Sequence, residues 1–333
     1  MFRRSKLSWT NAAALARFLN DVRNDSPWLS SRGFMRDRAD SAAVVETEKA
    51  LMEAESASGR LGTFVLHNDD RIVACVQVDD RQDDGRVAVF SNAETHPYYQ
   101  RRGTFWRHLG IPCIRAFARG SFDRLEALTW TYNRKGIPVY KRFGFRAVPG
   151  TSLLLENYLP SIVKHPATAA FFGRHDFLRY LANERSYGYD SCDRDGLRLF
   201  SYRWERAGET LEVLVDWERR QVICIDRDDW CIWCYTLQAD PFIVHYRLAN
   251  KSDRSVVYCL HKRNGGSETT RLQPILPNTV GEGDIHLGGG HAEATVTFEL
   301  AGERVPFRMR RHPARRAQQA GAVRDAAARE QRA

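Results

Sequence analysis

The chain has no long apolar run, and this absence bounds its class. In this chain of 333 residues, every apolar stretch is much shorter than the ~18 residues that a membrane-spanning helix needs. The N-terminal segment MFRRSKLSWTNAAALARFL is basic but has neither a long apolar core nor a small-residue cleavage site, so we expect no secretion signal. With 43% hydrophobic and 27% charged residues, the composition is that of a soluble globular protein of about two domains.

Motifs of several common site types are missing or incomplete. No Gly-x-Ser-x-Gly element supports a hydrolase. Cys231 and Cys234 form one close cysteine pair, but a zinc ribbon needs two such pairs with turn residues around them, and this pair lies in the aromatic run WCIWCY. The acidic segment Asp226–Asp229 lacks the glycine and final glutamate of a calcium loop. We therefore expect no metal site and interpret the acidic segment as a hairpin turn.

Cysteine is present without a disulfide pattern. The count of seven is odd, and most of these residues lie inside apolar runs. Free thiols that serve as small core residues are typical of a reducing compartment, so we expect a cytoplasmic protein. The cysteines are Cys75, Cys113, Cys192, Cys224, Cys231, Cys234 and Cys259.

Positive charge is concentrated at the C-terminal end. From Arg304 onward there are nine arginines against Asp325 and Glu330, a net +7 of the chain's +9. Nucleic-acid binding usually requires a basic face on a folded surface rather than a basic tail. We therefore expect residues 313–333 to form a solvated tail, disordered or helical, and do not expect a nucleic-acid partner.

The first half of the chain alternates helical and strand patterns, which predicts a mixed α/β sheet with crossover helices. A kink or a short break is expected at Gly110–Pro112 because proline lacks a backbone N–H. Helical patterns cover residues 11–22, 42–55, 104–120 and 136–142; strand patterns cover 63–67, 71–78, 86–90, 125–131, 146–148 and 152–158.

The composition changes near Pro160, where PSIVKHPAT suggests a linker before a helix at residues 169–183. Nine short strand-like runs at regular spacing follow, from LEVLVDW to VPFRMR, which is typical of a β-sandwich or barrel. Their tryptophans are expected in the core. We therefore predict domains at residues 1–160 and 161–312, with the basic tail at 313–333.

The segment HPYYQRRGTFW places a glycine turn directly before a helix. The first N–H groups of a helix have no partner within it, and the helix dipole adds partial positive charge there. Gly103 would let the backbone approach a phosphate group closely, and Arg101 and Arg102 add charge. Short glycine turns before helices are common, however, so the segment alone is a weak signal.

Residues downstream strengthen the interpretation. A strand is followed by Asn133, then by Tyr140 and by the pair Gly144–Phe145. Together with the turn Gln100–Phe105, this order resembles the GNAT superfamily of acetyltransferases, whose turn has the form (Gln/Arg)-x-x-Gly-x-(Gly/Ala). The resemblance covers roughly residues 5–160.

The resemblance implies acetyl transfer from acetyl-CoA to a primary amine. It implies that Gln100 starts a turn whose amides, from Arg101 to Thr104, hold the CoA pyrophosphate. It places Asn133 on the pantetheine arm or between splayed strands, and gives main-chain cofactor contacts to the strand end near Thr95. Tyr140 matches the residue that protonates the departing thiolate, a role open to a phenol because it is neutral at pH 7.

Two features leave alternatives open. Phe105, counted among the cofactor-binding residues, stands where the family has a small residue; its ring either points into the core or crowds the cofactor. The attacking amine must lose a proton, and Glu94 is our first choice of base, although a solvated turn carboxylate fits it equally. His96 is more typical of a turn histidine.

Two functions remain. In the favoured one, the chain is an N-acetyltransferase whose amine acceptor is a small molecule, a peptide or a protein lysine, and whose β-domain walls the acceptor cleft, drives homodimerisation or recruits a target. In the alternative, a GNAT-like first half senses acyl-CoA or binds nothing, and the protein is a scaffold.

Overall fold

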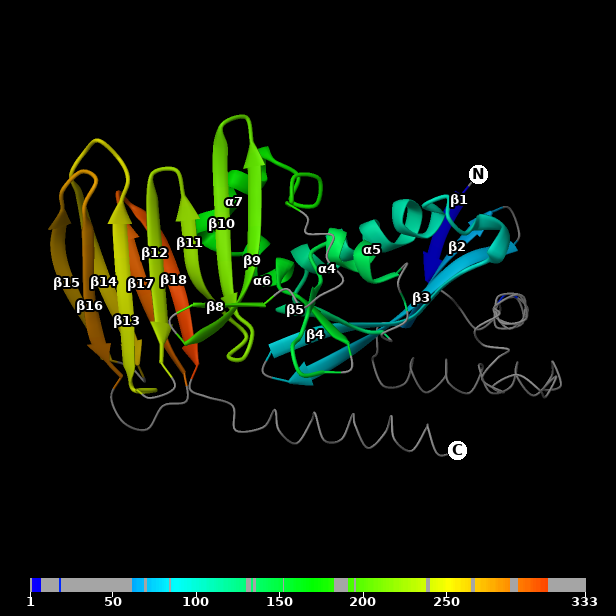
Figure 1. Ribbon diagram of the computed structural model, residues 1–333, viewed down its shortest axis with the longest axis horizontal. Coiled ribbons are helices and arrows are strands. Elements are labelled where there is room, and N and C mark those ends of the chain that lie inside the picture. The colour runs from blue at the N-terminus through cyan, green and yellow to red at the C-terminus, as the bar shows by residue number, and fades with distance from the viewer. Residues whose placement is uncertain are drawn as a thin grey trace. The chain divides into compact units, whose positions relative to one another are not determined.

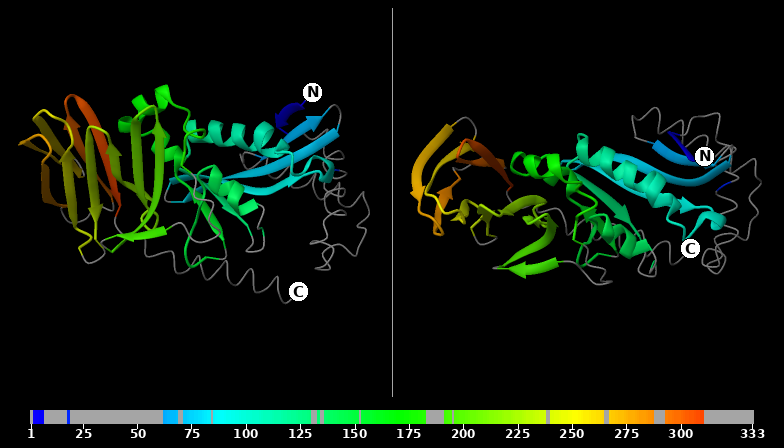
Figure 2. Two further views of the ribbon diagram at one scale, coloured as in Figure 1. Left: turned by 45° about the horizontal axis from the view of Figure 1, so that its top comes forward. Right: turned by 90° about the horizontal axis from the view of Figure 1, so that it is seen from above.

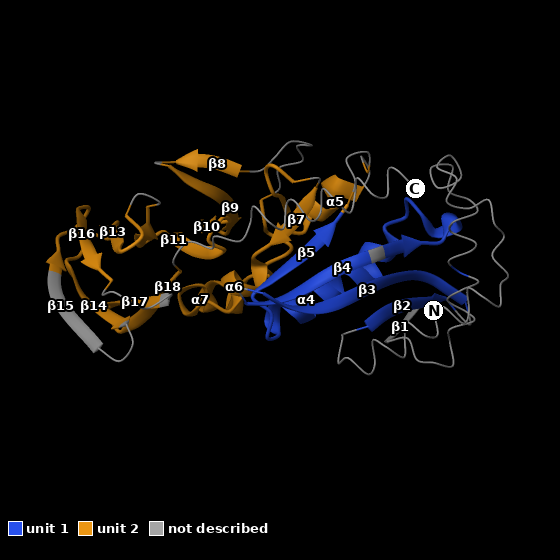
Figure 3. Cartoon of the chain, turned by 90° about the horizontal axis from the view of Figure 1, so that it is seen from below, with its two compact units in different colours: residues 1–128 blue, residues 129–333 orange. Residues whose placement is uncertain are grey.

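A computed structural model describes residues 2–6, 18, 62–68, 71–83, 85–129, 133, 136–151, 153–182, 191–194, 196–237, 240–264, 267–287 and 293–310. The chain divides into two compact units, residues 1–128 and 129–333 (Figure 3). The predicted helices at 11–22 and 42–55 lie outside the described residues except for Phe18, which is helical and buried. The tail at 313–333 also lies outside them, and the predicted domain boundary near residue 160 stays a prediction.

The first unit is built on a twisted sheet in the order β1-β2-β3-β4-β5 (Figure 1). The pairs β1–β2, β2–β3 and β3–β4 are antiparallel, whereas β4 and β5 run parallel. The strands are β1 (Phe2–Lys6), β2 (Gly62–Asn68), β3 (Arg71–Asp83), β4 (Gly85–Thr95) and β5 (Arg124–Leu128). A parallel pair requires a crossover, and the helical segment between β4 and β5 supplies it.

One sheet face is covered by the crossover helix α4 (Ile111–Arg119). The ring of Phe117 meets the rings of Phe64, Phe90 and Phe122 edge to face, with centroid distances of 6.0, 5.7 and 5.5 Å. Such edge-to-face pairs stabilise packing beyond the area that they bury. The predicted α/β arrangement of this part is thereby confirmed.

The crossover helix does not break at Gly110–Pro112. Instead a π-helical turn, η3 (Trp106–Gly110), runs directly into α4, and the N–H of Ile111 bonds to the carbonyl of Trp106, five residues back. Pro112 has no N–H to donate to an α-helical bond, and the wider π-helical turn directly precedes this gap. A Cβ on Gly110 would lie 2.6 Å from the Trp106 ring, so glycine is required by ring packing.

The second unit begins with α5 (Gly136–Arg142) and a short antiparallel pair, β6 (Arg146–Ala147) and β7 (Leu154–Asn157). The expected linker is wrong because it is largely helical, and the helix expected at 169–183 begins earlier, at Pro166, and ends at Arg174. Two short helices, α6 (Leu159–Val163) and α7 (Pro166–Arg174), follow, each with a proline in its first turn. Proline suits that position because its N–H would have no partner there and its φ is already helical.

The rest of the second unit is two antiparallel sheets. One has the order β16-β13-β12-β11-β10-β9-β8, the other β15-β14-β17-β18. The strands are β8 (Ser191–Arg194), β9 (Leu197–Arg206), β10 (Glu209–Asp216), β11 (Gln221–Arg227), β12 (Trp230–Thr236), β13 (Ile243–Asn250), β14 (Val256–Asn264), β15 (Ser267–Ile275), β16 (Val280–His286), β17 (Glu293–Leu300) and β18 (Glu303–Arg310). The sequence patterns did not predict β8 and β9.

The two sheets face each other as a sandwich (Figure 2). Tyr246 of one sheet packs its ring 5.6 Å from Phe298 of the other, and its hydroxyl lies 3.3 Å from that of Tyr258. Cys234 approaches the Met309 sulfur at 3.8 Å. The prediction of a mostly β second part is confirmed. Trp204, Trp217 and Trp230 are buried as expected, whereas Trp233 is only half-buried.

Among the described helices, none combines the length and apolar character that crossing a bilayer would need.

Candidate functional site

The site begins where β4 leaves the regular sheet. Cys75 on β3 pairs with Glu94, whereas Gln77 pairs with Ser91, so three steps on β4 oppose two on β3. This extra residue is a β-bulge, a device that bends a strand and is frequent beside active sites. The described pairs with parallel β5 end at Phe90, yet β4 continues to Thr95. Its last residues thus extend past the pairs with β5 that the described part of the chain shows.

A short 3-10 helix, η2 (Pro97–Tyr99), follows this strand end. Gln100 then folds back, and its side-chain Nε2 donates to the Thr95 carbonyl at 3.0 Å. The Gln100 N–H donates to the Pro97 carbonyl at 3.1 Å. The glutamine thus ties the strand end to the turn, and the structure brings these two predicted site residues together.

The turn itself carries two left-handed residues, Arg101 at φ 61° and Gly103 at φ 68°. The conformation is easy for glycine and uncommon for arginine. The first intrahelical bond runs from Arg107 N to the Gly103 carbonyl at 2.9 Å, so the amides of Thr104 and Phe105 precede it and have no acceptor within the helix. A Cβ on Gly103 would meet no atom within 4 Å. The space above the turn is open, and amides with positive dipole charge border it.

The Phe105 ring does not occupy that open space. Its side chain is 7% exposed, and the ring packs edge to face against Trp106 at 5.0 Å. Arg102 stays outside, with its guanidinium 4.7 Å from the exposed Tyr98 ring. Of the two possibilities for Phe105, the structure shows the inward orientation.

The two titratable candidates for a base lie at the strand end. Glu94 is half-buried on β4. His96 has a structural task, because its N–H donates to the Val73 carbonyl at 3.0 Å and its Nδ1 accepts from the Tyr98 N–H at 3.3 Å, capping η2. This arrangement is that of a turn histidine. The assignment of Glu94 as base stays a prediction.

The remaining predicted residues lie in the second unit. Asn133 caps α5: its Oδ1 accepts from the Gly136 N–H at 2.9 Å and its Nδ2 donates to Thr129 Oγ1 at 2.9 Å. A Cβ on Gly136 would lie 2.4 Å from Asn133 Nδ2. The asparagine side chain therefore caps the N-terminus of the helix that carries Tyr140. Its contact with the cofactor stays a prediction.

Tyr140 lies near the C-terminal end of α5 and is 9% exposed. Its ring packs edge to face on Phe145 at 5.3 Å. Its carbonyl accepts from the N–H groups of Phe143 and Phe145 at 3.0 and 3.2 Å, closing the turn after the helix. The tyrosine is held by this turn on both its backbone and its ring.

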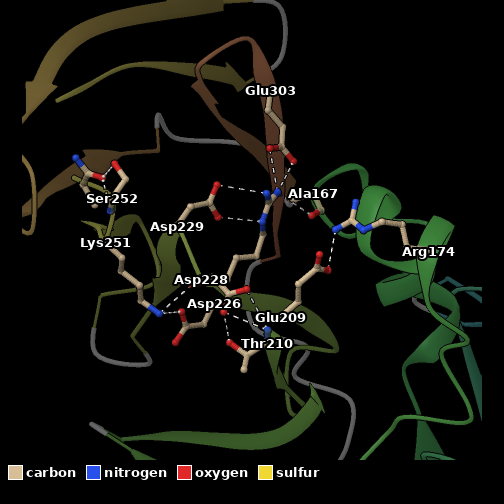
Figure 4. A network of polar contacts seen from close by, with 12 residues as sticks. Ala167, Arg174, Glu209, Thr210, Asp226, Asp228, Asp229, Lys251, Ser252 and Glu303 are labelled. Atoms are coloured by element: carbon tan, nitrogen blue, oxygen red, sulfur yellow. Dashed lines mark hydrogen bonds and ion pairs between the residues drawn. The ribbon is translucent and has the colours of Figure 1, made fainter. Parts of the chain in front are cut away.

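The acidic segment of the sandwich is a hairpin whose carboxylates have protein partners, as Figure 4 shows. Asp226 pairs with Lys251, and Asp228 accepts from Thr210 Oγ1 at 2.6 Å. Arg227 lies between Asp229 at 3.3 Å and Glu303 at 2.9 Å. Within the described ranges there is no group of three or more His, Cys, Asp or Glu side chains that could hold a metal ion.

The two cysteines of the close pair cannot share one ion, because they are three residues apart on a strand and so point to opposite faces. Cys231 lies 3.9 Å from Cys224, whereas Cys234 points toward Met309. Burial raises the pKa of the Cys224 and Cys234 thiols above their usual range, which disfavours the thiolate that a metal would bind.

No protein-family model matches the chain, and no curated protein matches its sequence. Solved acetyltransferase structures are similar to it over about half its length. A PaiA N-acetyltransferase from Thermoplasma acidophilum in complex with coenzyme A is 11% identical over 47% of this chain and 99% of its own, with a TM-score of 0.37. A GNAT-family acetyltransferase from Streptococcus pneumoniae is 16% identical over 47% and 98%, with a TM-score of 0.36. The putative acetyltransferase YncA from Salmonella typhimurium, with acetyl-CoA, is 16% identical over 47% and 94%, with a TM-score of 0.37.

Because these identities are below 25% and the TM-scores below 0.5, a function has to be inferred from this chain's own residues.

Proposed function

We propose that the chain is an N-acetyltransferase that moves an acetyl group from acetyl-CoA to a primary amine. The observation that carries the proposal is the turn after β4: a bulged strand end, a left-handed Arg101–Gly103 turn and a helix start with open space above it. A pyrophosphate is the kind of group that such a turn accepts, because amides and the helix dipole both favour negative charge.

In this proposal each residue of the turn has a role in binding the cofactor. The amides from Arg101 to Thr104 bind the pyrophosphate, and Gly103 leaves room for it. Gln100 holds the turn against the Thr95 carbonyl. The buried Phe105 contributes its amide rather than its ring. The backbone of the strand end up to Thr95 binds the pantetheine arm, to which Asn133 also contributes.

The chemistry is direct attack by the neutral amine on the thioester carbonyl in a ternary complex. Glu94 receives the proton that the amine loses, and Tyr140 donates its phenolic proton to the CoA thiolate as the carbon–sulfur bond breaks. No metal takes part in this proposal. The acceptor is a small-molecule amine, a peptide or a protein lysine, and we place the protein in the cytoplasm.

The domain plan belongs to the same proposal: an acyl-CoA-binding domain at residues 1–160, the helix and β-sandwich at 161–312 and a basic tail at 313–333. The sandwich is assigned to acceptor binding, target recruitment or homodimerisation.

The test is turnover with acetyl-CoA and a panel of primary amines, following free CoA. Replacing Tyr140 with Phe should lower kcat by about 100-fold, the usual contribution of general acid catalysis, while the affinity for acetyl-CoA changes little. Tyr180→Phe is the matched control, since Tyr180 lies on the sandwich side beside Arg206. Equal turnover by Tyr140→Phe would remove the tyrosine from its role. Binding of acetyl-CoA without turnover of any amine would favour the alternative, a sensor or scaffold.

A further inference from the structure

Arg146 joins the helix that carries Tyr140 to the β-sandwich. The residue begins β6 and is 5% exposed. Its Nη1 donates to the carbonyls of Lys141 and Phe145 at 3.2 and 3.3 Å. Its Nη2 donates to the carbonyl of Ser201 on β9 at 3.3 Å. One guanidinium thus bonds to the end of α5 on one side and to a sandwich strand on the other.

The sandwich also supplies a ring beneath the charge. The Arg146 guanidinium lies 4.9 Å from the Tyr202 ring centroid, within the range of a cation–π interaction. The Tyr202 hydroxyl in turn accepts from the N–H of Tyr158 at 3.1 Å. A buried charge is costly unless hydrogen bonds compensate it, and here three carbonyls and a ring face provide that compensation.

The carbonyls that Arg146 binds belong to the turn that holds Tyr140. Lys141 directly follows Tyr140 in the chain, and its carbonyl also accepts from the Gly144 N–H at 3.0 Å. Phe145 donates its N–H to the Tyr140 carbonyl and presents its ring to the tyrosine ring. Displacing Arg146 would remove one hydrogen bond from each of these two neighbours of Tyr140.

A second side chain holds the same turn from β7. Asn157 Nδ2 donates to the Phe143 carbonyl at 2.8 Å. Gly144 is left-handed at φ 91°, and a Cβ there would lie 2.8 Å from Leu159. The turn therefore requires glycine at this position, and Asn157 on β7 and Arg146 on β6 both hold it by hydrogen bonds.

We propose that Arg146 is a positioning residue for Tyr140, and that the β-sandwich is thereby a working part of the transferase rather than an attachment to it. The inference rests on the proposed function, because it takes Tyr140 as the acid. Lysine cannot replace Arg146: its ammonium is a single point of charge, whereas the planar fork reaches three carbonyls in fixed directions.

The kinetic test is a double-mutant cycle on the full chain. Arg146→Lys should lower kcat by about 10- to 100-fold, the effect of misplacing a catalytic group by roughly 1 Å, with the KM for acetyl-CoA within about twofold. In a Tyr140→Phe background the same substitution should lower kcat by less than about twofold, because the group that it positions is already gone. Equal losses in both backgrounds would show a general structural effect and overturn the proposal.

Arg203→Ala is the matched control. Arg203 lies on the same strand β9, but it is exposed, and it forms an ion pair with the exposed Glu205 at 3.8 Å. Its replacement should leave kcat unchanged. If Arg146→Lys does not fold, Tyr202→Leu removes the ring beneath the guanidinium and should give the same kcat effect and the same dependence on Tyr140.

Hydrogen exchange separates this inference from the proposed function. Amide protection at Phe143, Gly144 and Phe145 should fall at least tenfold in Arg146→Lys and stay unchanged in Arg203→Ala. Unchanged protection would overturn the coupling whether or not the chain is an enzyme. If acetyl-CoA does not bind the wild-type chain, the proposed function fails, and the role of Arg146 in positioning an acid fails with it. The hydrogen-exchange result would then report only whether Arg146 stabilises the turn after α5.

Discussion

Left-handed residues have different consequences in the two units. In the sandwich, Ala207–Gly208 and Ala301–Gly302 take positive φ between consecutive strands, where they close tight two-residue hairpins. In the first unit, Arg101 and Gly103 take the same conformation between a strand and a helix. After each hairpin the next strand pairs its backbone with the strand before it. The turn after β4 is instead followed by a helix start, whose first amides have no acceptor within the helix.

The charged side chains differ in the same way. Around the acidic hairpin of the sandwich, Asp226, Arg227, Asp228 and Asp229 all have protein partners (Figure 4). At the turn after β4, Arg101 and Arg102 are exposed. We therefore take a left-handed turn as a candidate site only where amides at a helix start and exposed charged side chains lie beside it.

The largest expected effect lies in the sandwich, where side chains act on stability. Trp204 is fully buried, donates its Nε1–H to the Phe177 carbonyl at 2.8 Å and meets the Phe172 ring at 5.0 Å. Replacing it with alanine removes a large apolar side chain and should lower the free energy of unfolding by about 3–5 kcal/mol. Urea unfolding measures this change. A loss below about 1 kcal/mol would contradict the tight packing seen between β9 and α7.

The second expected effect is a pH dependence of the free energy of unfolding, and it again concerns the second unit. Burial lowers the pKa of His165 from 6.5 to about 4, while its Nε2–H donates to the Pro306 carbonyl at 2.8 Å. Between these pH values the unfolded chain binds a proton that the folded chain does not. The free energy of unfolding should therefore fall as pH drops from about 6.5 to 4, by about 3 kcal/mol from this residue.

Urea unfolding at pH 7 and pH 4.5 tests this dependence by comparing wild type with His165→Gln. The variant can still donate to the carbonyl but takes up no proton, so its stability should fall less over this interval. Parallel pH profiles would show that His165 is not the group responsible.

The smallest effect compares the two kinds of left-handed glycine directly. Gly103 and Gly208 have φ of 68° and 81°, and a Cβ on either would meet nothing within 4 Å. Substituting valine at either should cost about 1–2 kcal/mol of stability, the penalty of a left-handed side chain. Only Gly103→Val should also weaken acetyl-CoA binding, by about 10- to 100-fold, because its side chain would displace one charge-assisted hydrogen bond or more.

Calorimetry with acetyl-CoA measures both variants. Equal affinity for the two would place the cofactor away from the turn.

Local patterns predicted the elements with strong periodicity and missed those defined by pairing. The strands β10 to β14 were visible as apolar runs, because each has a buried face of its own. The pattern of β9 is harder to recognise, because its alternation breaks at the adjacent buried residues Leu199 and Phe200 and polar residues separate its other apolar positions. The prolines at residues 160 and 166 suggested a linker but begin helices, a distinction that depends on the residues after each proline.

The residues of the candidate site are a prediction from the sequence, and the structure adds the geometry of the turn that Gln100 and Gly103 form. The turn pattern indicates Gln100 and Gly103, but the sequence allows both orientations of the Phe105 ring. The bulge in β4 had no signal in the sequence, because it exists only in the register against β3. Arg146 likewise has no local signature: its partners Lys141 and Ser201 are 5 and 55 residues away.

The most direct test is calorimetry of the wild-type chain with coenzyme A, set beside pantetheine, which lacks the pyrophosphate and the phosphorylated adenosine attached to it. We predict saturable binding of coenzyme A and binding of pantetheine weaker by at least about 100-fold, since charge-assisted hydrogen bonds to the pyrophosphate each contribute about 1.5–3 kcal/mol. No binding of coenzyme A at millimolar concentration, or equal affinity for the two ligands, would contradict the assignment of the turn after β4.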